Sequence, residues 1–440
     1  MTLADALIEW LERRPAVDDA DIVGWRFSMA EGDGVRAGIR ASRLGGPYEG
    51  PGVTRRLVGT LELHWSDGLV TLRGLDRRAV VQPAQELVEL RNDAVAPRRG
   101  RLPPLAGPTA LPEVETFDPA VARAVTGDAG TGLHTLERLL ERSRSGGIRR
   151  VDAVMRASRT ARTVATSRGF RADWHDTACS IELWGDEIAG ASYGRRCLPT
   201  ASDLDRLAEE IATLAPCLSK AQDLPSDPRG VLFMPNVVHG LLERLVLPNL
   251  SGRAIRDGRS LFSRADLEER RQIIRADLDL VVDTTLPFEL ASAPCSSEGV
   301  PAGRVALIAA GRLASPMVDP ATAADWGLAP TPIPNGKPPA MLTSALPTID
   351  YDEALTVLER GVVVRDLPGL HTQPARRAAY ALVAPDAQAV AGGTGRGRCA
   401  VRLAGGLLDH LRQPSTRPVH VPGDPSVGLL VLTGVELLPA

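Results

Sequence analysis

His239 and Glu243, which are four residues apart, are the residues in this sequence that most resemble a pair of metal ligands. In a helix this spacing places both side chains on one face, where an imidazole and a carboxylate can share a metal ion. The pair alone leaves such a site short of ligands and without a general base, so a histidine on a helix surface is the competing interpretation. No metal-ligand spacing connects the other histidines, which are His64, His134, His175, His371, His410 and His420.

Two further stretches gather residue types that catalysis uses. Cys295 to Gly299 holds a thiol, two hydroxyls and the carboxylate of Glu298, which could reach a partner's active site. Ala391 to Arg398 is rich in glycine, but a phosphate-binding loop opens a helix, whereas an alternating strand-like run follows here and predicts a hairpin turn. The five cysteines include no Cys-x-x-Cys pair, which argues against a disulfide framework or a zinc ribbon.

The stretch from Ala293 to Trp326 resembles the signature segment of the TldD/TldE (PmbA) family, which includes zinc metallopeptidases. In that family a Ser-x-Glu-Gly-Val turn precedes a basic residue, a strand, a glycine hairpin and the start of a helix. The matching positions are Ser296, Ser297, Glu298, Gly299 and Val300 for the turn, Arg304 for the base, Leu307 and Ile308 for the strand, Gly311 for the hairpin, and Thr322 and Ala323 for the exit.

The resemblance also says where zinc would be bound. In the zinc-bearing members a helix carries His-Glu-x-x-x-His, with two ligands and a glutamate that activates water. Alignment on two adjacent leucines places Glu243, Arg244 and Pro248 at those three positions. A guanidinium is always protonated and proline offers no ligand atom. The family's zinc subunits also supply a cysteine near the C-terminus, whereas the last cysteine here is Cys399. The resemblance therefore implies no zinc and no catalytic residue in this chain.

The expected role is that of the zinc-less TldE/PmbA type, which the family pairs with a zinc-bearing TldD-type chain around a peptide-accepting cleft. We expect a non-catalytic subunit of a heterodimeric metallopeptidase that processes peptides or a peptide-derived natural product. His239, Ser297, Glu298 and Arg304 are candidates to face the cleft or the partner. A stand-alone hydrolase of atypical mechanism and a peptide-binding protein without hydrolytic activity are the alternatives.

Composition and hydropathy argue against nucleic acid or a membrane as the partner of this chain. With 440 residues, 44% of them hydrophobic, and a net charge of -3, the chain can bury a large core and has no basic field for nucleic acid. The first residues form an amphipathic pattern rather than a signal peptide, and no run of about 18 apolar residues predicts a transmembrane helix. A cytoplasmic protein without a membrane or nucleic-acid partner is expected.

The patterning predicts an α+β fold in two parts. Residues 1–226 should form an N-terminal domain with a mixed sheet and flanking helices, and residues 227–440 a strand-rich, barrel-like domain. Helices are expected at the N-terminus, at 77–92, from Pro119 onward with a glycine break at 127–132, and at 202–221 with Ser202 and Asp205 as a capping box. Residues 92–115 should be a loop. Strands are expected at 22–27, 53–65, 69–72, 149–157, 160–167, 175–183, 231–234, 278–283, 304–308, 362–366, 379–383, 398–403 and 429–437.

Overall fold

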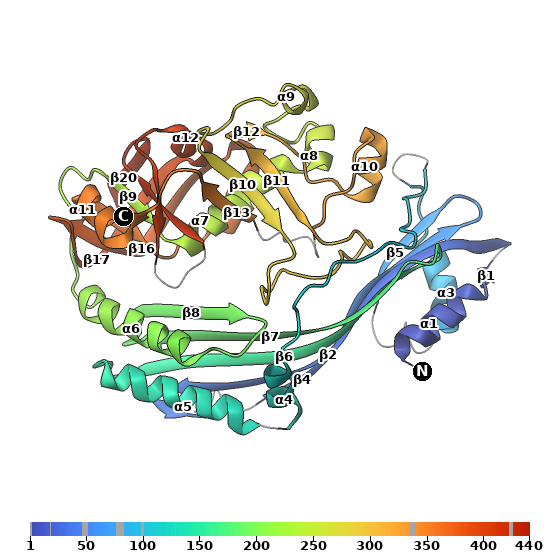
Figure 1. Cartoon of the computed structure of the whole chain (residues 1–440), viewed down its shortest axis with the longest axis horizontal. Coiled ribbons are helices and arrows are strands. Elements are labelled where there is room, and N and C mark those ends of the chain that lie inside the picture. The colour runs from blue at the N-terminus through green and yellow to red at the C-terminus, as the bar shows by residue number, and fades with distance from the viewer. Residues whose placement is uncertain are drawn as a thin grey trace.

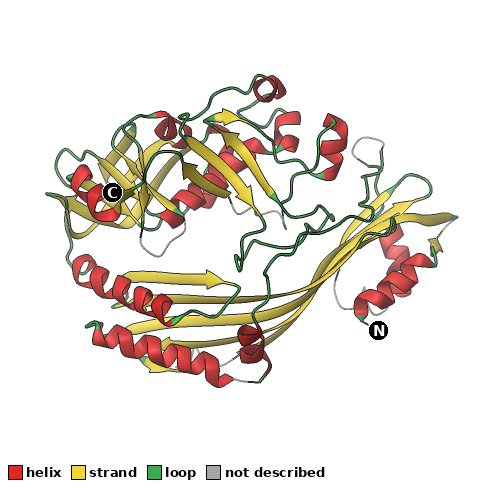
Figure 2. Ribbon diagram, in the orientation of Figure 1, coloured by secondary structure: helices red, strands yellow, loops and turns green. Residues whose placement is uncertain are grey.

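The computed structural model describes residues 2–17, 19–45, 52–75, 83–97, 101–127, 129–333, 340–421 and 426–440. It has the expected α+β architecture, with three sheets and helices packed against them (Figures 1 and 2). One sheet is built from the first 195 residues, and the other two from the chain after residue 229. The prediction of two domains divided at residue 226 stays a prediction. Among the described residues no helix is long and apolar enough to cross a membrane.

The N-terminal sheet is antiparallel and has the order β5-β4-β2-β6-β7-β8, with β1 and β3 paired to β2. Its strands are β1 (Ala16–Val17), β2 (Ala20–Arg40), β3 (Arg43–Leu44), β4 (Gly52–Trp65), β5 (Val70–Leu75), β6 (Val151–Thr166), β7 (Arg171–Gly185) and β8 (Ala189–Arg195). The two strands expected at 149–157 and 160–167 are one strand, β6, and that expectation was wrong. The polar stretch that suggested a break is the partly exposed middle of β6, which spans two separate cores.

Helices cover one face of this sheet at both ends (Figure 1). Phe27 on β2 faces α1 (Leu3–Glu12) and α3 (Pro83–Asn92) in one core, while Val151 on β6 faces α4 (Pro119–Thr126), α5 (Ala129–Ser145) and α6 (Ala201–Leu218) in another. From Trp25 onward in β2, and throughout β6, the odd-numbered residues point to this face, as a period of two requires. The opposite, helix-free face carries the even-numbered residues of both strands.

Most of the expected helices are confirmed, with corrections at their ends. The capping box of α6 is Thr200 with Asp203 rather than Ser202 with Asp205, because the helix begins two residues earlier than expected. The glycine break before α5 is shorter than expected, since the helix begins at Ala129. The expected helix at 77–92 is present as α3, and residues 77–82 lie outside the described residues. The described part of 93–115 contains no helix or strand beyond one bridge at Val95.

The C-terminal part holds a four-stranded sheet, β12-β11-β10-β13, and an eight-stranded curled sheet, β14-β18-β19-β9-β15-β16-β17-β20. The strands of the first are β10 (Leu278–Asp283), β11 (Arg304–Ala309), β12 (Arg312–Leu313) and β13 (Ala340–Ser344). Those of the second are β9 (Gly230–Phe233), β14 (Ile349–Asp350), β15 (Arg360–Val364), β16 (Ala379–Ala391), β17 (Thr394–Gly406), β18 (Arg417–His420), β19 (Val427–Val431) and β20 (Val435–Pro439). One core of aliphatic residues lies between the two sheets and includes Val231, Leu280 and Val401.

In the C-terminal part the expected hairpin is confirmed, and one expected strand is wrong. The glycine-rich stretch forms the hairpin between β16 and β17, as predicted. The single strand expected at 429–437 is wrong, because Gly434 adopts a left-handed φ of 77° and the chain turns there. β19 then pairs with β9 and β18, while β20 pairs with β17. The remaining helices are α7 (Pro235–Leu241), α8 (Gly252–Arg256), α9 (Arg264–Glu268), α10 (Pro320–Trp326), α11 (Tyr351–Leu358) and α12 (Leu407–Arg412).

Candidate functional site

The first candidate region is the helical segment that follows β9. All four residues of β9 are buried between neighbouring strands, and Pro235 then starts α7 at a position where a proline costs no helix hydrogen bond. After α7 the backbone changes to a π-helical turn, Leu242–Val246, and then to a 3₁₀ turn, Leu247–Leu250. π-Turns are rare and often mark functional positions.

The π-turn decides which side chains share a face. The N–H of Leu247 donates to the carbonyl of Leu242, five residues earlier. Glu243 and Arg244 lie within this π-turn, whereas Pro248 lies in the 3₁₀ turn that follows. His239 lies on α7 with its Nε2 atom 3.9 Å from Oε2 of Glu243, and both side chains are partly exposed. The structure thus brings the predicted pair together at a distance longer than a hydrogen bond.

The residues on this turn do not fit a zinc ion. Arg244 is exposed and its Nε donates to the carbonyl of Gln373 at 3.1 Å, and Pro248 has no donor atom to offer. Nowhere in the described ranges do three or more His, Cys, Asp or Glu residues gather closely enough to hold a metal. The arrangement leaves His239 and Glu243 as an exposed pair and supplies neither a third ligand nor a base beside them.

The turn is held in place by Asn249, whose side chain is 1% exposed. Its Nδ2 donates to the carbonyls of Leu245 and Ala375 at 2.9 and 2.7 Å, and its Oδ1 accepts from the N–H of Leu261 at 2.8 Å. Every strong hydrogen-bonding direction of the amide but one is therefore used by backbone. Asn249 fixes the position of the π-turn relative to two loops.

The second candidate region is the turn at Ser296–Val300, between β10 and β11. The buried Ser296 hydroxyl accepts from the backbone N–H groups of Glu298 and Val300, at 3.1 and 3.2 Å. Gly299 has a φ of 79°, and a Cβ there would lie 2.8 Å from the Cβ of Ala106. Only glycine fits this conformation and this close approach. The turn is thereby pressed against the N-terminal part of the chain.

Glu298 meets a buried charge cluster on the helix-free face of the N-terminal sheet. Arg26 on β2 lies 3.3 Å from the carboxylate of Glu298 and 2.5 Å from that of Glu62 on β4. His64, two residues further along β4, is hydrogen bonded to Glu62 at 2.8 Å. Burial raises the pKa of Glu298, and the carboxylates of Asp319 and Glu62 raise it further against the attraction of Arg26. For Glu62 the cost of burial is outweighed by His64 and Arg26, so its pKa is lowered.

A cavity of about 410 Å³ lies beside this cluster. His64 forms part of its floor, and Leu102–Leu105 and the turn at Ser167 and Arg168 form its walls. The sequence did not single out Arg26, Glu62 or His64, since they lie far from Glu298 along the chain. The alternation of β2 and β4 puts Arg26, Glu62 and His64 on one sheet face, but nothing in the sequence says that the turn would cover them.

The remaining candidates stand apart from these contacts. Ser297 is in the same turn as Glu298, and Arg304 is an exposed residue at the start of β11. The pentapeptide Gly190–Gly194 has the spacing Gly-x-Ser-x-Gly of serine hydrolases, with Ser192 at its centre. It lies inside the straight strand β8 and not at the sharp strand-to-helix turn that exposes a nucleophile, so it is not an elbow of that type.

Comparison with known proteins gives a consistent result. Residues 228–417 match the family model described as the PmbA/TldA metallopeptidase C-terminal domain. The crystal structure of TldE from Thermococcus kodakarensis is similar over 99% of this chain and 100% of that chain, with a TM-score of 0.79 at 14% identity.

Two proposed modulators of DNA gyrase are also similar, each with a TM-score of 0.73. The protein from Thermotoga maritima is 17% identical and covers 99% of both chains. The protein from Bacteroides thetaiotaomicron is 15% identical and covers 100% of this chain and 98% of its own. No curated protein matches the chain in sequence. At such identities these solved structures show a shared fold.

Proposed function

Because the chain belongs to the TldD/TldE (PmbA) family and carries its metallopeptidase C-terminal domain, we propose that it is a non-catalytic, TldE-like subunit. In this proposal a TldD-like partner binds the zinc ion and cuts the peptide, and the two chains form a heterodimer. This chain contributes surface and shape to the cleft. The substrate is a peptide or a peptide-derived natural product.

The proposal rests on the types of side chain found on the π-turn and on the 3₁₀ turn that follows it. At the two positions where the resemblance places histidine ligands, residues 243 and 248, this chain has glutamate and proline. Arg244, where a water-activating carboxylate would stand, is a permanent cation bonded to the carbonyl of Gln373. These side chains support the proposal because they lack the two histidines and the general base that the resemblance implies for a zinc-bearing subunit.

The experiment is coexpression with a TldD-like chain encoded beside this one, followed by purification of each chain alone and of the complex. Zinc is measured in all three samples, together with hydrolysis of an unfolded peptide such as reduced insulin B chain. We expect a stable complex with one zinc per heterodimer, peptide hydrolysis by the complex, and no zinc on this chain alone.

The control tests whether the exposed histidine matters. His239→Ala is compared with His134→Ala, since His134 on α5 also lies 3.9 Å from a glutamate on its own helix. Both variants should leave the zinc content and the rate of the complex unchanged. Stoichiometric zinc on this chain alone, or cleavage by it that only His239→Ala abolishes, would establish a stand-alone enzyme. Peptide binding by this chain that never requires a zinc-bearing partner would establish a binding protein instead.

A further inference from the structure

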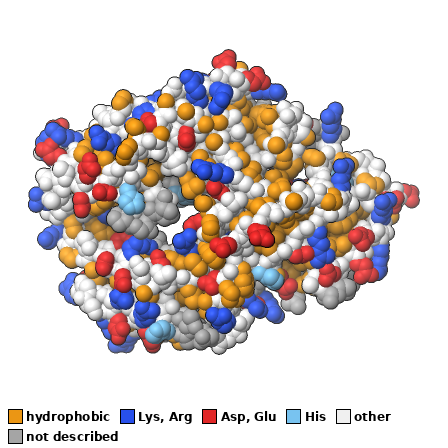
Figure 3. All heavy atoms as spheres, in the orientation of Figure 1, with side chains coloured by type: hydrophobic (Ala, Val, Ile, Leu, Met, Phe, Trp, Pro, Cys, Tyr) orange, Lys and Arg blue, Asp and Glu red, His pale blue; other side chains and the backbone are white. Residues whose placement is uncertain are grey.

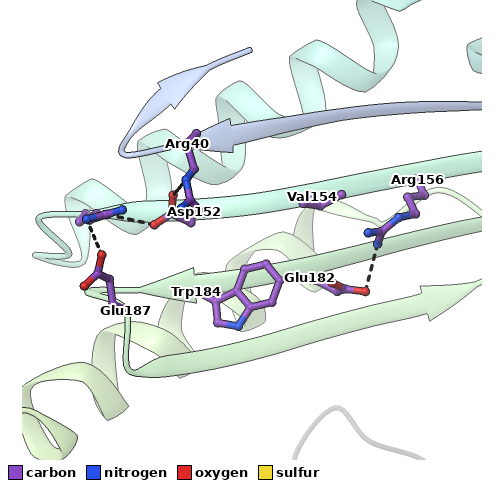
Figure 4. Close-up of a pocket in the computed structure, with 8 residues that line it drawn as sticks. Arg40, Asp152, Val154, Arg156, Glu182, Trp184 and Glu187 are labelled. Carbon is purple, nitrogen blue, oxygen red and sulfur yellow. Dashed lines mark hydrogen bonds and ion pairs between the residues drawn. The ribbon is translucent and has the colours of Figure 1, made fainter. Parts of the chain in front are cut away.

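A second cavity lies on the helix-free face of the N-terminal sheet, at the end opposite Glu298 (Figure 4). It has a volume of about 390 Å³, which is within the range of small-ligand pockets. Its lining comes from the ends of β2, β6 and β7 and from the turn before β8. None of these residues belongs to the π-turn or to the Glu298 cluster.

The apolar part of the cavity is a valine and an indole. Val154 on β6 is 7% exposed and forms the floor, while Trp184 on β7 is 39% exposed. The indole leans over Gly190 of β8, where a Cβ would stand 3.6 Å from its ring. A large aromatic side chain that is left this open on a sheet provides a surface for an apolar or aromatic ligand group.

The acidic groups around the cavity already have cationic partners. The carboxylate of Asp152 accepts from the N–H of Ala41 at 2.8 Å and from Nε of Arg150 at 3.1 Å, with Arg40 at 3.7 Å. Arg150 also pairs with Glu187. On the other side of the indole, Arg156 lies 3.0 Å from Glu182.

A further cation, Arg36, stands next to the lining residue Arg156, although it does not line the cavity itself. Arg36 on β2 is directly opposite Arg156 in the strand register, so both guanidinium groups rise from the same face of the sheet. The side chain of Arg36 makes no hydrogen bond or ion pair with any of the described residues. Two like charges at directly opposed positions repel each other, and their Cβ atoms are about 5 Å apart. A carboxylate between them would remove this repulsion and accept from both side chains.

We propose that this cavity binds a carboxylate that bears an apolar or aromatic group, as at the carboxyl end of a peptide. The carboxylate lies between Arg36 and Arg156, and the side chain lies on Val154 and Trp184. The ion pair between Arg156 and Glu182 does not block this position, because both partners are about half exposed and such a pair contributes little. The site is independent of the proposed subunit role and of any zinc.

The test is isothermal titration of the whole chain, without a partner, with N-acetylphenylalanine. We expect saturable binding at one site and at least about tenfold weaker binding of N-acetylphenylalanine amide and of acetate, since each lacks one of the two recognised groups. A tripeptide that ends in phenylalanine distinguishes the sources: tighter binding assigns a peptide end, and equal binding assigns the acid alone.

Variants locate the site. Arg36→Gln and Trp184→Ala should each weaken binding by about tenfold, while Arg149→Gln, at an arginine 87% exposed outside the cavity, should leave it unchanged. Circular dichroism melting confirms that each variant is folded. The proposal fails if no saturable binding occurs, if the amide binds as well as the acid, or if folded Arg36→Gln and Trp184→Ala bind like the parent protein.

Discussion

At the scale of single residues, buried charged groups connect segments that lie far apart in the chain. Arg26 neutralises two carboxylates at once, and one of them, Glu298, comes from the other part of the chain. One guanidinium cannot neutralise two carboxylates, and burial further disfavours the charged form of a carboxylate that is not neutralised. Glu298 therefore holds its proton to a higher pH than an exposed glutamate does.

This shift predicts a dependence of stability on pH. The carboxyl of Glu298 has a pKa near 4.5 in the unfolded chain and a raised pKa in the folded protein, so folding takes up a proton between these two values. The contribution of Glu298 to stability is complete below pH 4.5 and is lost as the pH rises through the folded pKa. Glu298→Gln should remove this loss, so the variant should gain stability relative to the parent protein between pH 4 and pH 7.

The measurement is the free energy of unfolding by urea at several pH values in that range. Glu436→Gln, at an exposed glutamate on β20, is the control and should follow the parent protein at every pH. A difference between Glu298→Gln and the parent that stays constant from pH 4 to pH 7 would contradict the raised pKa.

At the scale of elements, the helical segment after β9 contains a π-turn and a 3₁₀ turn that are stabilised by contacts with other parts of the chain. The π-turn replaces the usual α-helical hydrogen-bond pattern with a bond between residues five apart, and the following 3₁₀ turn begins with Leu247 and Pro248. Asn249 compensates from the side by bonding three backbone groups. The irregular helix is thus held by tertiary hydrogen bonds as well as by its own.

Replacing this tether should be costly. Asn249→Ala leaves the N–H of Leu261 and the carbonyl of Ala375 without their partner in a buried place, which predicts a loss of about 2–4 kcal/mol in the free energy of unfolding. Asn236→Ala is the matched control, since that exposed side chain makes a single bond to the carbonyl of Arg365. Equal losses in urea unfolding of the two variants would show that Asn249 has no special role.

At the scale of the whole molecule, the N-terminal sheet and the C-terminal part are joined by buried polar contacts. Arg196, 6% exposed, donates to the carbonyls of Glu289, Leu290 and Ser292 and also to that of Thr177 on β7. Asp176 lies 3.3 Å from the same guanidinium. Arg196 thereby fixes the segment before the Ser296 turn to the N-terminal sheet. Glu298 in that turn contacts Arg26 of the same sheet.

Loss of this arginine should destabilise the protein strongly. Arg196→Ala leaves Asp176 buried with only Arg162 as a cationic partner and releases four carbonyls, which predicts a loss of about 3 kcal/mol or more. Arg195→Ala is the neighbouring control, because Arg195 is 45% exposed and its pair with Glu289 contributes little. The two variants are compared by thermal and urea unfolding, and a similar effect of both would show that the buried contacts are not what joins the two parts.

Much of the local structure could be read from the sequence. The apolar face of α6, the start of α4 at Pro119, the strands β10 and β11 and the glycine hairpin follow from periodicity and from residue preferences that act over a few positions. The family signature at Ala293 to Trp326 also gave the correct local elements, including the hairpin at Gly311. The true lengths of β2 and β6 could not be predicted from the sequence. Each strand contributes to two separate cores, and between them it loses the simple alternation of apolar and polar residues that marks a strand.

The sequence by itself determined the fold class and indicated the family through the stretch from Ala293 to Trp326, since both depend on residues close together in the chain. Only the tertiary structure decided that Glu298 meets Arg26, that Asn249 holds a π-turn, and that Arg36 and Arg156 stand opposite each other on β2 and β6. These contacts join residues tens to hundreds of positions apart. They depend on strand register and on how the two parts of the chain pack, and no short stretch of sequence carries that information.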